Sequence, residues 1–277
     1  MSAVTIGHAT APASWLRSLA TLVQRGLRDY RRAPLIWGLP LGVMSAFEVL
    51  LYPSIRESLG NAFESYPPAV IEAFGITDLS TVEAFMHAEM FSIVLPFAVA
   101  WFAIRCVAIT LAGAEENGYL DALLAAPVAR GTLSASAFAT AGLAAAAILA
   151  VIGAMTAIAG AITGDAVAIA RLVAGLAGVW ALTLFFAGCA TLAAGVVHRA
   201  GIVQGAIGGL FGAMYLLDVA AKLSDPIGSL RRLSAMRWYG TPVQTGLDLA
   251  GFVVLVLGGL MLALTGAIWA TRRDVTG

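Results

Sequence analysis

The stretch "LAGFVVLVLGGLMLALTGAIWA", residues 249–270, decides the fold class because it is long, apolar and free of charge. A helix rises about 1.5 Å per residue, so about 20 apolar residues cross the roughly 30 Å hydrocarbon core of a bilayer. The strands of a membrane barrel would alternate polar and apolar residues with a period of two, and this stretch does not. Residues 249–270 therefore predict a membrane-spanning helix.

The composition extends this prediction to the whole chain. Of its 277 residues, 60% are hydrophobic and 12% are charged, whereas a soluble domain has about 45–50% apolar and about 25% charged residues. The mean hydropathy of +0.89 agrees. We therefore expect an all-α, polytopic membrane protein. A net charge of zero argues against a nucleic-acid partner, and the scattered His and Cys residues show no spacing typical of a metal site.

Apolar runs of this kind give six predicted spans in one membrane domain that covers residues 1–277. Residues 14–32 precede the first span and combine apolar residues at helical spacing with arginines mostly off that face. This pattern is typical of an amphipathic helix in the membrane interface. Two longer polar segments, 53–88 and 222–248, follow the first and fifth spans. The predicted spans are 34–52, 89–112, 135–162, 172–197, 201–221 and 249–270.

The basic residues set the predicted orientation, because cytoplasmic loops carry an excess of Lys and Arg. With both ends of the sequence inside, the cytoplasmic pieces hold nine arginines and the outer pieces hold six basic residues. Four of those six lie in the long segment 222–248, and long segments weigh less in the rule. We therefore expect both ends and residues 113–131 in the cytoplasm, with 53–88 and 222–248 outside.

A charged island, "GAEENGYLDALLAAPVARGTL", residues 113–133, interrupts the apolar pattern between the second and third spans. Residues 115–128 read as a short amphipathic helix, because acidic residues at its start suit the helix dipole and Pro127 limits its end. An ordinary loop helix resting on lipid headgroups satisfies this spacing. A helix on which a partner docks also satisfies it, but by spacing alone the loop helix is favoured.

The island resembles the cytoplasmic coupling helix of ABC exporter permeases of the type-2 membrane family. That family's pattern is an acidic pair, a glycine, an aliphatic "LxxLLxxP" run and an arginine. The matching residues are Glu115, Glu116, Gly118, Leu120, Leu123, Leu124, Pro127 and Arg130. Residues 14–32 are similar to the family's interfacial connecting helix, residues 230–248 to its outer segment before the last span, and "WATRRDV", residues 269–275, to its basic tail. Ala235 follows Ser234 where the family usually has proline.

The resemblance implies the permease subunit of an ATP-driven exporter in a bacterial cytoplasmic (inner) membrane. Two permease copies, or two paired permeases, would work with two copies of an ATP-binding subunit. The substrate would be hydrophobic or amphipathic: a drug, an antibiotic or a lipid-like molecule. The island would dock the ATP-binding subunit. The residues expected to carry this docking are Glu115, Glu116, Gly118, Tyr119, Leu120, Asp121, Leu123, Leu124, Pro127 and Arg130.

The chain lacks the motif with which it could bind ATP itself. A P-loop, G-x-x-x-x-G-K-[ST], needs a lysine that reaches the phosphates. The only lysine, Lys222, stands in "DVAAKLSD" with no glycine loop before it. We therefore expect no enzyme activity and no cofactor in this chain, and ATP and Mg²⁺ would be bound by the partner subunit. An intramembrane enzyme is the least favoured alternative, because no catalytic constellation is visible.

Polar residues inside the predicted spans are costly and are functional candidates by default. Arg105 lies about two turns from the inner end of its span and either snorkels to the headgroups or lines a substrate path. Asp218 and Lys222 are four residues apart, which favours a local ion pair. In the alternative to the exporter, an ion-coupled secondary transporter, Glu48 or Asp218 would titrate. The possible substrate-path residues are Arg105, Glu48, Gln204 and Tyr215.

The fifth predicted span carries small residues at four-residue steps: Gly201, Gly205, Gly209 and Ala213. This spacing lets two helices approach closely. The ridge serves either packing within one subunit or a seam between two subunits. The resemblance to permeases that work in pairs favours the seam.

Overall fold

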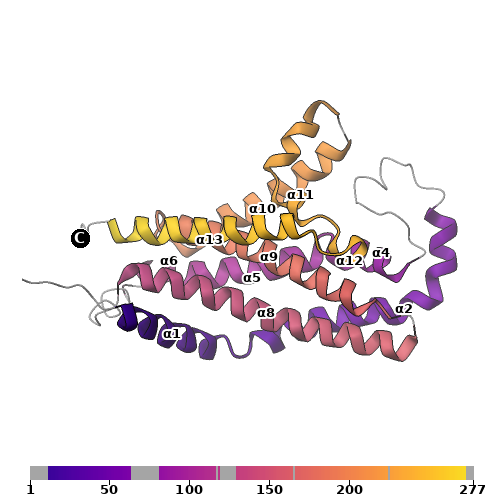
Figure 1. Cartoon of the computed structure of the whole chain (residues 1–277), viewed down its shortest axis with the longest axis horizontal. Coiled ribbons are helices and arrows are strands. Elements are labelled where there is room, and N and C mark those ends of the chain that lie inside the picture. Colours follow the sequence, from indigo (N-terminus) through magenta and orange to yellow (C-terminus); the bar gives the residue numbers. More distant parts are fainter. Residues whose placement is uncertain are drawn as a thin grey trace, which may run out of the picture.

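The computed structural model describes residues 12–63, 81–116, 118, 129–164, 166–223 and 225–272. All regular structure in these residues is helical, and Figure 1 shows an elongated bundle whose long helices run along its main axis. The predicted all-α protein with six membrane-length helices is confirmed. These helices are Pro34–Ser58, Val82–Glu116, Arg130–Thr163, Ile169–Ala194, Ala200–Leu223 and Leu249–Thr271.

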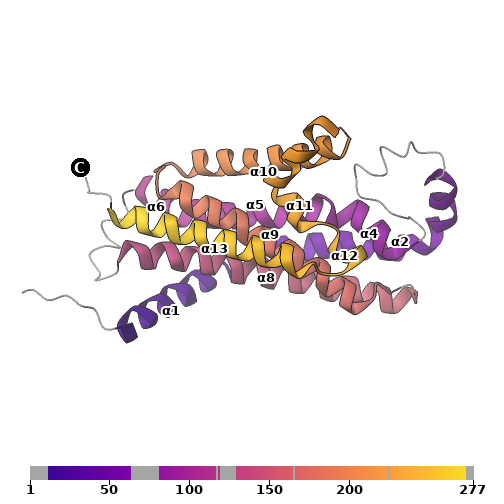
Figure 2. The ribbon, with the colours of Figure 1, turned by 45° about the horizontal axis from the view of Figure 1, so that its top comes forward.

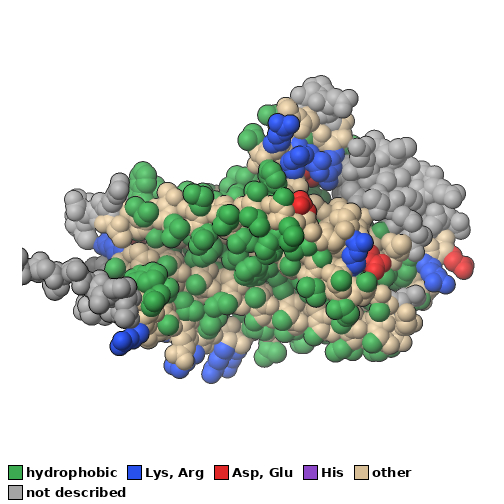
Figure 3. All heavy atoms as spheres, in the orientation of Figure 1, with side chains coloured by type: hydrophobic (Ala, Val, Ile, Leu, Met, Phe, Trp, Pro, Cys, Tyr) green, Lys and Arg blue, Asp and Glu red, His purple; other side chains and the backbone are tan. Residues whose placement is uncertain are grey.

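The first helix, α1 (Pro12–Asp29), is amphipathic and packs against α8 (Arg130–Thr163). A Cβ at Gly26 would lie 2.6 Å from Thr140 Oγ1, so glycine permits the close approach of the two helices. Figure 3 shows basic side chains protruding at the lower edge of the bundle, where α1 lies, while hydrophobic side chains cover the middle. This division of charged and apolar surface is that of a helix lying in the membrane interface.

The first span consists of the π-helical turn η1 (Pro34–Gly38) and α2 (Leu39–Phe63). The helix continues through Pro53 and beyond residue 52, where the apolar run ends, because helical hydrogen bonding does not require apolar residues. Ser45 Oγ and Thr156 Oγ1 lie 2.7 Å apart in the buried contact with α8. Such a hydroxyl pair holds two membrane helices together at a point that water does not reach.

The second span is built from four consecutive helices: α4 (Val82–Met86), η2 (His87–Phe91), α5 (Val94–Thr110) and α6 (Ala112–Glu116). It begins at Val82, before residue 89, where the sequence analysis started the span. Thr81 caps α4, because its Oγ1 accepts a hydrogen bond from the Ala84 N–H at 3.3 Å. The cap satisfies a donor that the first turn of a helix would otherwise leave free.

The remaining long helices are α9 (Ile169–Ala194), α10 (Ala200–Leu223) and α13 (Leu249–Arg272). α9 lies at the centre of the bundle: 72% of the residues in its apolar 18-residue stretch are buried. In α10 the corresponding share is 17%. Figure 2 shows α10 on the outer edge of the bundle. Of the six long helices, α10 is therefore the one least covered by its own subunit.

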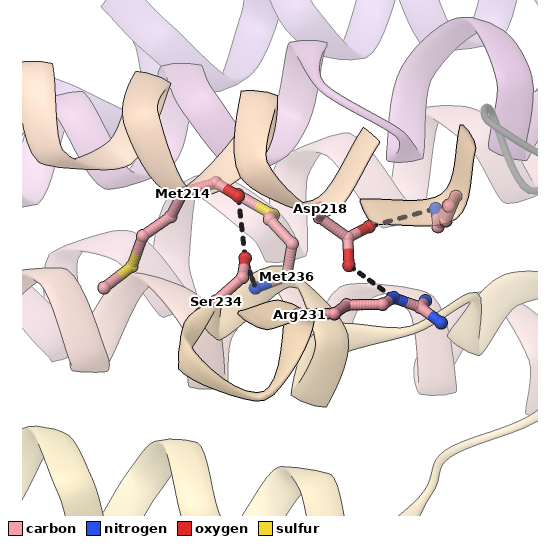
Figure 4. A network of polar contacts seen from close by, with 6 residues as sticks. Met214, Asp218, Arg231, Ser234 and Met236 are labelled. Atoms are coloured by element: carbon pink, nitrogen blue, oxygen red, sulfur yellow. Dashed lines mark hydrogen bonds and ion pairs between the residues drawn. The ribbon is translucent and has the colours of Figure 1, made fainter. Parts of the chain in front are cut away.

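Between α10 and α13 the chain forms η3 (Asp225–Leu233), α11 (Ala235–Tyr239) and α12 (Pro242–Thr245), which fold back onto α10 and α9. Ser234 ties this segment to α10, because its hydroxyl donates to the Met214 carbonyl at 2.7 Å (Figure 4). The same oxygen accepts a hydrogen bond from the Met236 N–H at 3.1 Å and so caps α11. Ala235 is the buried first residue of that helix.

The two ends of the bundle carry different parts of the chain. Figures 1 and 2 place α1, α6 and the last turns of α13 together at one end, called here the α6 end. The turn between α9 and α10 lies there too, because it contacts α6. α11 and α12 lie toward the opposite end, called here the α11 end. Both ends of the described chain thus lie at the same end of the bundle, as an even number of spans requires.

α9 and α13 approach each other so closely that their backbones are in contact. A Cβ at Gly259 would lie 2.5 Å from the Leu184 carbonyl oxygen. Seven residues further on, a Cβ at Gly266 would lie 2.7 Å from the Thr191 carbonyl oxygen. Real side chains do not tolerate such distances to backbone atoms, so only glycine fits at these two positions.

Candidate functional site

The island predicted to dock a partner falls largely outside the described residues, which omit 117 and 119–128. Gly118 is described and has a φ of +69°, in the left-handed region that glycine adopts without strain. The flanking residues Glu115, Glu116 and Arg130 are also described. The predicted docking residues that lie outside the described residues are Tyr119, Leu120, Asp121, Leu123, Leu124 and Pro127.

Glu116, the last residue of α6, is hydrogen-bonded to the start of α10. Its Oε2 accepts a hydrogen bond from the Ala200 backbone N–H at 3.1 Å. The first N–H groups of a helix have no partner inside the helix, and the positive end of the helix dipole favours a negative charge there. Glu116 therefore caps α10 from another helix.

Glu115 contacts the turn that precedes α10. Its Oε2 lies 3.4 Å from His198 Nε2, and the contact is an ion pair when His198 is protonated. That carboxylate oxygen is buried and has no hydrogen-bond partner among the described residues. A Cβ at Gly113 would lie 3.7 Å from the Ala200 Cβ. Together these contacts show that α6 packs directly on the first turn of α10.

Two residues from the acidic and basic ends of the island line the same cavity in the structure. Glu115 and Arg130 line one cavity of about 40 Å³ at the α6 end, between the last residues of α9 and α13. The described residues on either side of the island therefore lie near each other on the bundle. The residues that line this cavity are Leu111, Glu115, Arg130, Leu133, Ser134, Ala194, Gly195 and Ala270.

A larger crevice of about 600 Å³ lies between α1, α8 and the α5–α6 segment. Sites for small molecules have volumes of about 300–1,000 Å³ and combine apolar walls with a few polar groups. Arg25 and Asp29 provide charge on the α1 side, and Ser136 and Thr140 provide hydroxyls on α8. The residues that line the crevice are Leu22, Arg25, Gly26, Asp29, Tyr30, Ile109, Thr110, Gly113, Ala114, Leu133, Ser136, Ala137 and Thr140.

Arg105 points away from the core of the bundle. Its side chain is exposed and lines a cavity of about 190 Å³ that it shares with Asp29, Arg32 and other residues of α1, η1 and α5. Tyr30 lines the same cavity, and burial raises the pKa of its hydroxyl above its ordinary value. Arg105 thus lies beside the arginine-rich interfacial helix.

Asp218 lies in a polar network near the α11 end (Figure 4). Its Oδ2 is 3.0 Å from Lys222 Nζ, which is the ion pair expected from their spacing, and its Oδ1 accepts a hydrogen bond from Arg231 Nε at 2.7 Å. The sequence analysis did not find Arg231, because η3 brings it to α10 only in the folded chain. With each carboxylate oxygen bound to a cation, Asp218 anchors η3 to α10.

The four residues proposed for a substrate path do not gather in one place. Tyr215 lines a cavity of about 50 Å³ with Asp218 and His87, separate from the cavity of Arg105. Glu48 is half-buried on α2 and interacts electrostatically with Glu89 of η2. Gln204 is half-buried on α10 and lines neither cavity.

The small-residue ridge of α10 lies on an open face. A Cβ added at Gly201, Gly205 or Gly209 would meet no atom of the described residues within 4 Å, and Ala213 is exposed. The ridge therefore does not serve packing within the described part of this subunit.

Six membrane-length helices and an amphipathic helix at one end define a polytopic all-α membrane protein. Residues 8–270 match the family model described as the multidrug efflux system permease Rv1217c, C-terminal domain. The match covers nearly the whole chain, so the protein belongs to this family of efflux permeases, in agreement with the resemblance to type-2 exporter permeases. The comparison with curated proteins gives no significant match. Membership of a permease family indicates a transport subunit rather than an enzyme.

Proposed function

We propose that this protein is the membrane-spanning subunit of an ATP-driven exporter whose ATP is hydrolysed by a separate subunit. The observation that carries the proposal is the permease-family match over residues 8–270. The chain's only lysine, Lys222, is paired with Asp218 near the α11 end and follows no glycine loop, so a nucleotide and its Mg²⁺ need a partner chain.

The α6 end is the side on which the ATP-binding subunit docks. The arginine-rich α1 and Arg130 lie at this end, which supports a cytoplasmic location by the positive-inside rule. Residues 117–128 stand in the sequence between Glu116 and Arg130, the described residues that flank them at this end. The leucines of the island, Leu120, Leu123 and Leu124, fill a groove on the ATP-binding subunit. The membrane that the permease spans is the inner membrane of a bacterium.

The working complex contains two permease copies, or two paired permeases, and two ATP-binding subunits. The open glycine face of α10 supports this, because small residues at four-residue spacing allow a second helix to pack closely. The substrate is hydrophobic or amphipathic: a drug, an antibiotic or a lipid-like molecule. The crevice of about 600 Å³ beside α1 supports such a substrate, because it combines apolar walls with Arg25 and Asp29.

Purification of the complex tests the proposal. The permease is co-expressed with an ATP-binding subunit from the same organism, as the intact chain and as Leu123→Asp. The matched control is Leu233→Asp on η3, where the leucine is 69% exposed and far from the α6 end. We expect the intact chain and Leu233→Asp to retain the ATP-binding subunit and its ATPase activity, and Leu123→Asp to lose both.

Retention of the subunit by all three proteins, with equal ATPase activity, contradicts docking through the island. Export that runs without an ATP-binding subunit and stops when ion gradients are collapsed contradicts the proposed energy source and favours the secondary-transporter alternative.

A further inference from the structure

The start of α10 depends on α6 for its cap. The residue before Ala200 is Arg199, whose side chain has donors and no acceptor and therefore cannot cap the helix. The acceptor comes instead from Glu116, 84 positions earlier in the chain, at 3.1 Å from the Ala200 nitrogen. A local cap forms wherever its helix goes, whereas this cap exists only while α6 and α10 keep their relative position.

The two ends of α10 are held by different means. Near the α11 end, Asp218 binds Arg231 of η3 and Ser234 donates to the Met214 carbonyl, so α10 moves together with η3 and α11. At the α6 end, Glu116 and the contact between Glu115 and His198 join α10 to α6. The rest of α10 is little covered by its own subunit. The contacts through which a displacement of α6 would reach α10 therefore lie at the first turn of α10.

α6 leads directly into the proposed docking island. Glu116 ends the helix, and residues 117–128 follow it in the chain. Glu116 thus stands between the part of the chain that receives the ATP-binding subunit and the helix that carries the open glycine face.

We propose that Glu116 is a positioning residue that couples the docking island to α10, passing the displacement caused by ATP binding to α10 through its hydrogen bond with the Ala200 N–H. Glu115 and His198 form a second, weaker point of attachment between the same elements. The proposal rests on the proposed function, and it gives the acidic pair a task beyond partner recognition: the carboxylates face α10 within their own subunit.

Three variants separate this link from simple docking. Glu116→Ala removes the acceptor, and Glu116→Gln keeps an oxygen that accepts the same hydrogen bond. Ala200→Pro removes the donor and leaves Glu116 untouched, at the first helical position, where proline is tolerated. Coupling through this bond requires Glu116→Ala and Ala200→Pro to behave alike and Glu116→Gln to resemble the intact protein.

The first measurement is amide hydrogen exchange on the purified permease, which needs no partner. In Glu116→Ala we expect the Ala200 amide to exchange about tenfold faster or more, because one charge-assisted hydrogen bond is lost. In Glu116→Gln we expect a change well below that of Glu116→Ala. Equal exchange in the intact protein and in Glu116→Ala overturns the link, whatever the fate of the proposed function.

The second measurement follows α10 in the assembled complex. A bimane label is placed at Ile202→Cys, an exposed position in the first turn of α10, with Cys106→Ala and Cys189→Ala as background. ATP with vanadate should shift the label's emission in the intact complex and in Glu116→Gln. The shift should be absent in Glu116→Ala and in Ala200→Pro. Because Ala200→Pro changes no docking residue, the ATP-binding subunit should stay bound and hydrolyse ATP in that variant.

The outcomes distinguish the two proposals. If the intact permease holds no ATP-binding subunit, the proposed function fails, and the exchange measurement still decides on the cap. If the emission shift persists in Glu116→Ala, the coupling role is overturned and the exporter proposal stands. If Glu116→Ala and Glu116→Gln both lose the ATP-binding subunit, Glu116 contacts the partner directly and the coupling role is likewise overturned.

Discussion

Two faces built from glycine behave in opposite ways in this molecule. On α9 and α13, Gly188, Gly259 and Gly266 bring two backbones of the same subunit into contact. On α10, Gly205 and Gly209 meet no described atom within 4 Å. Small residues at helical spacing therefore indicate where helices can approach closely, and the fold decides whether the approaching helix belongs to the same chain.

The difference follows from the position of each helix. α9 is the most buried span and has neighbours on most sides, whereas α10 is the least buried. A closed glycine contact stabilises the subunit, because close packing and weak Cα–H contacts act where water is absent. An open glycine face contributes no packing energy to the isolated subunit. It is stabilised only when a second helix packs against it. Substitutions at the two faces should therefore have different consequences.

The largest effect is expected at the closed face. In Gly259→Leu the new side chain collides with the Leu184 carbonyl, and the backbone of α9 cannot move away without breaking its own helix. Overpacking of this kind costs about 3 kcal/mol or more. We expect loss of expression, or a strongly lowered melting temperature in detergent, measured beside Gly205→Leu as the matched change on α10. Equal melting temperatures for the two variants would remove the distinction between the faces.

The double variant Gly205→Leu with Gly209→Leu should leave the subunit folded and prevent its pairing. A Cβ at either position meets no described atom within 4 Å, so the stability of the monomer should stay within about 0.5 kcal/mol of the intact value. Single-molecule photobleaching in nanodiscs should then show one permease copy where the intact protein shows two. A double variant that pairs normally places the seam elsewhere.

A smaller effect is expected where α10 is anchored to η3. Asp218→Asn weakens the contacts with Lys222 and Arg231, which are 18% and 32% exposed in their side chains. Loss of charge in such partly solvated pairs should cost about 1.5 kcal/mol, measured by thermal unfolding in detergent. ATP-driven export should survive in the folded variant. A folded Asp218→Asn protein with no export would favour the ion-coupled alternative.

The smallest effect concerns Tyr239, which holds α11 against the second span. Its buried hydroxyl donates to the Phe91 carbonyl at 2.7 Å, and burial raises its pKa above the ordinary value of about 10. Because the folded-state pKa is raised, the stabilisation is complete below pH 10 and is lost as the pH rises further. Tyr239→Phe should cost about 1 kcal/mol and reduce the alkaline loss of stability. An unchanged alkaline profile in Tyr239→Phe contradicts this assignment.

The fold class was predictable because membrane spans are local features. Runs such as residues 249–270 are recognised in the sequence by their length and lack of charge. The structure contains a long helix over each predicted span. The start of the second span was less visible, because the chain between Val82 and Glu89 mixes acidic and apolar residues. There the cap from Thr81, not hydropathy, begins the helix.

The contacts that define the candidate site were not predictable in the same way. The pair Asp218–Lys222 follows from a four-residue spacing, but Arg231 reaches Asp218 only because η3 folds back. Likewise, nothing in the local sequence joins Glu116 to Ala200. The four-residue spacing on α10 predicted a close helix approach there, whereas no such prediction was made for the glycines of α9 and α13. Local periodicity reports helices and their faces, whereas the choice of neighbour is a property of the whole fold.

Cross-linking between copies tests most directly whether α10 meets a second permease. A single cysteine is introduced as Gly205→Cys in a Cys106→Ala, Cys189→Ala background, with Met261→Cys on α13, 68% exposed, as the control position. A disulfide needs Cα atoms within about 7 Å of each other. Oxidation in native membranes should convert Gly205→Cys to a covalent dimer and leave Met261→Cys monomeric. A monomer at position 205, or equal cross-linking at both positions, would contradict the account.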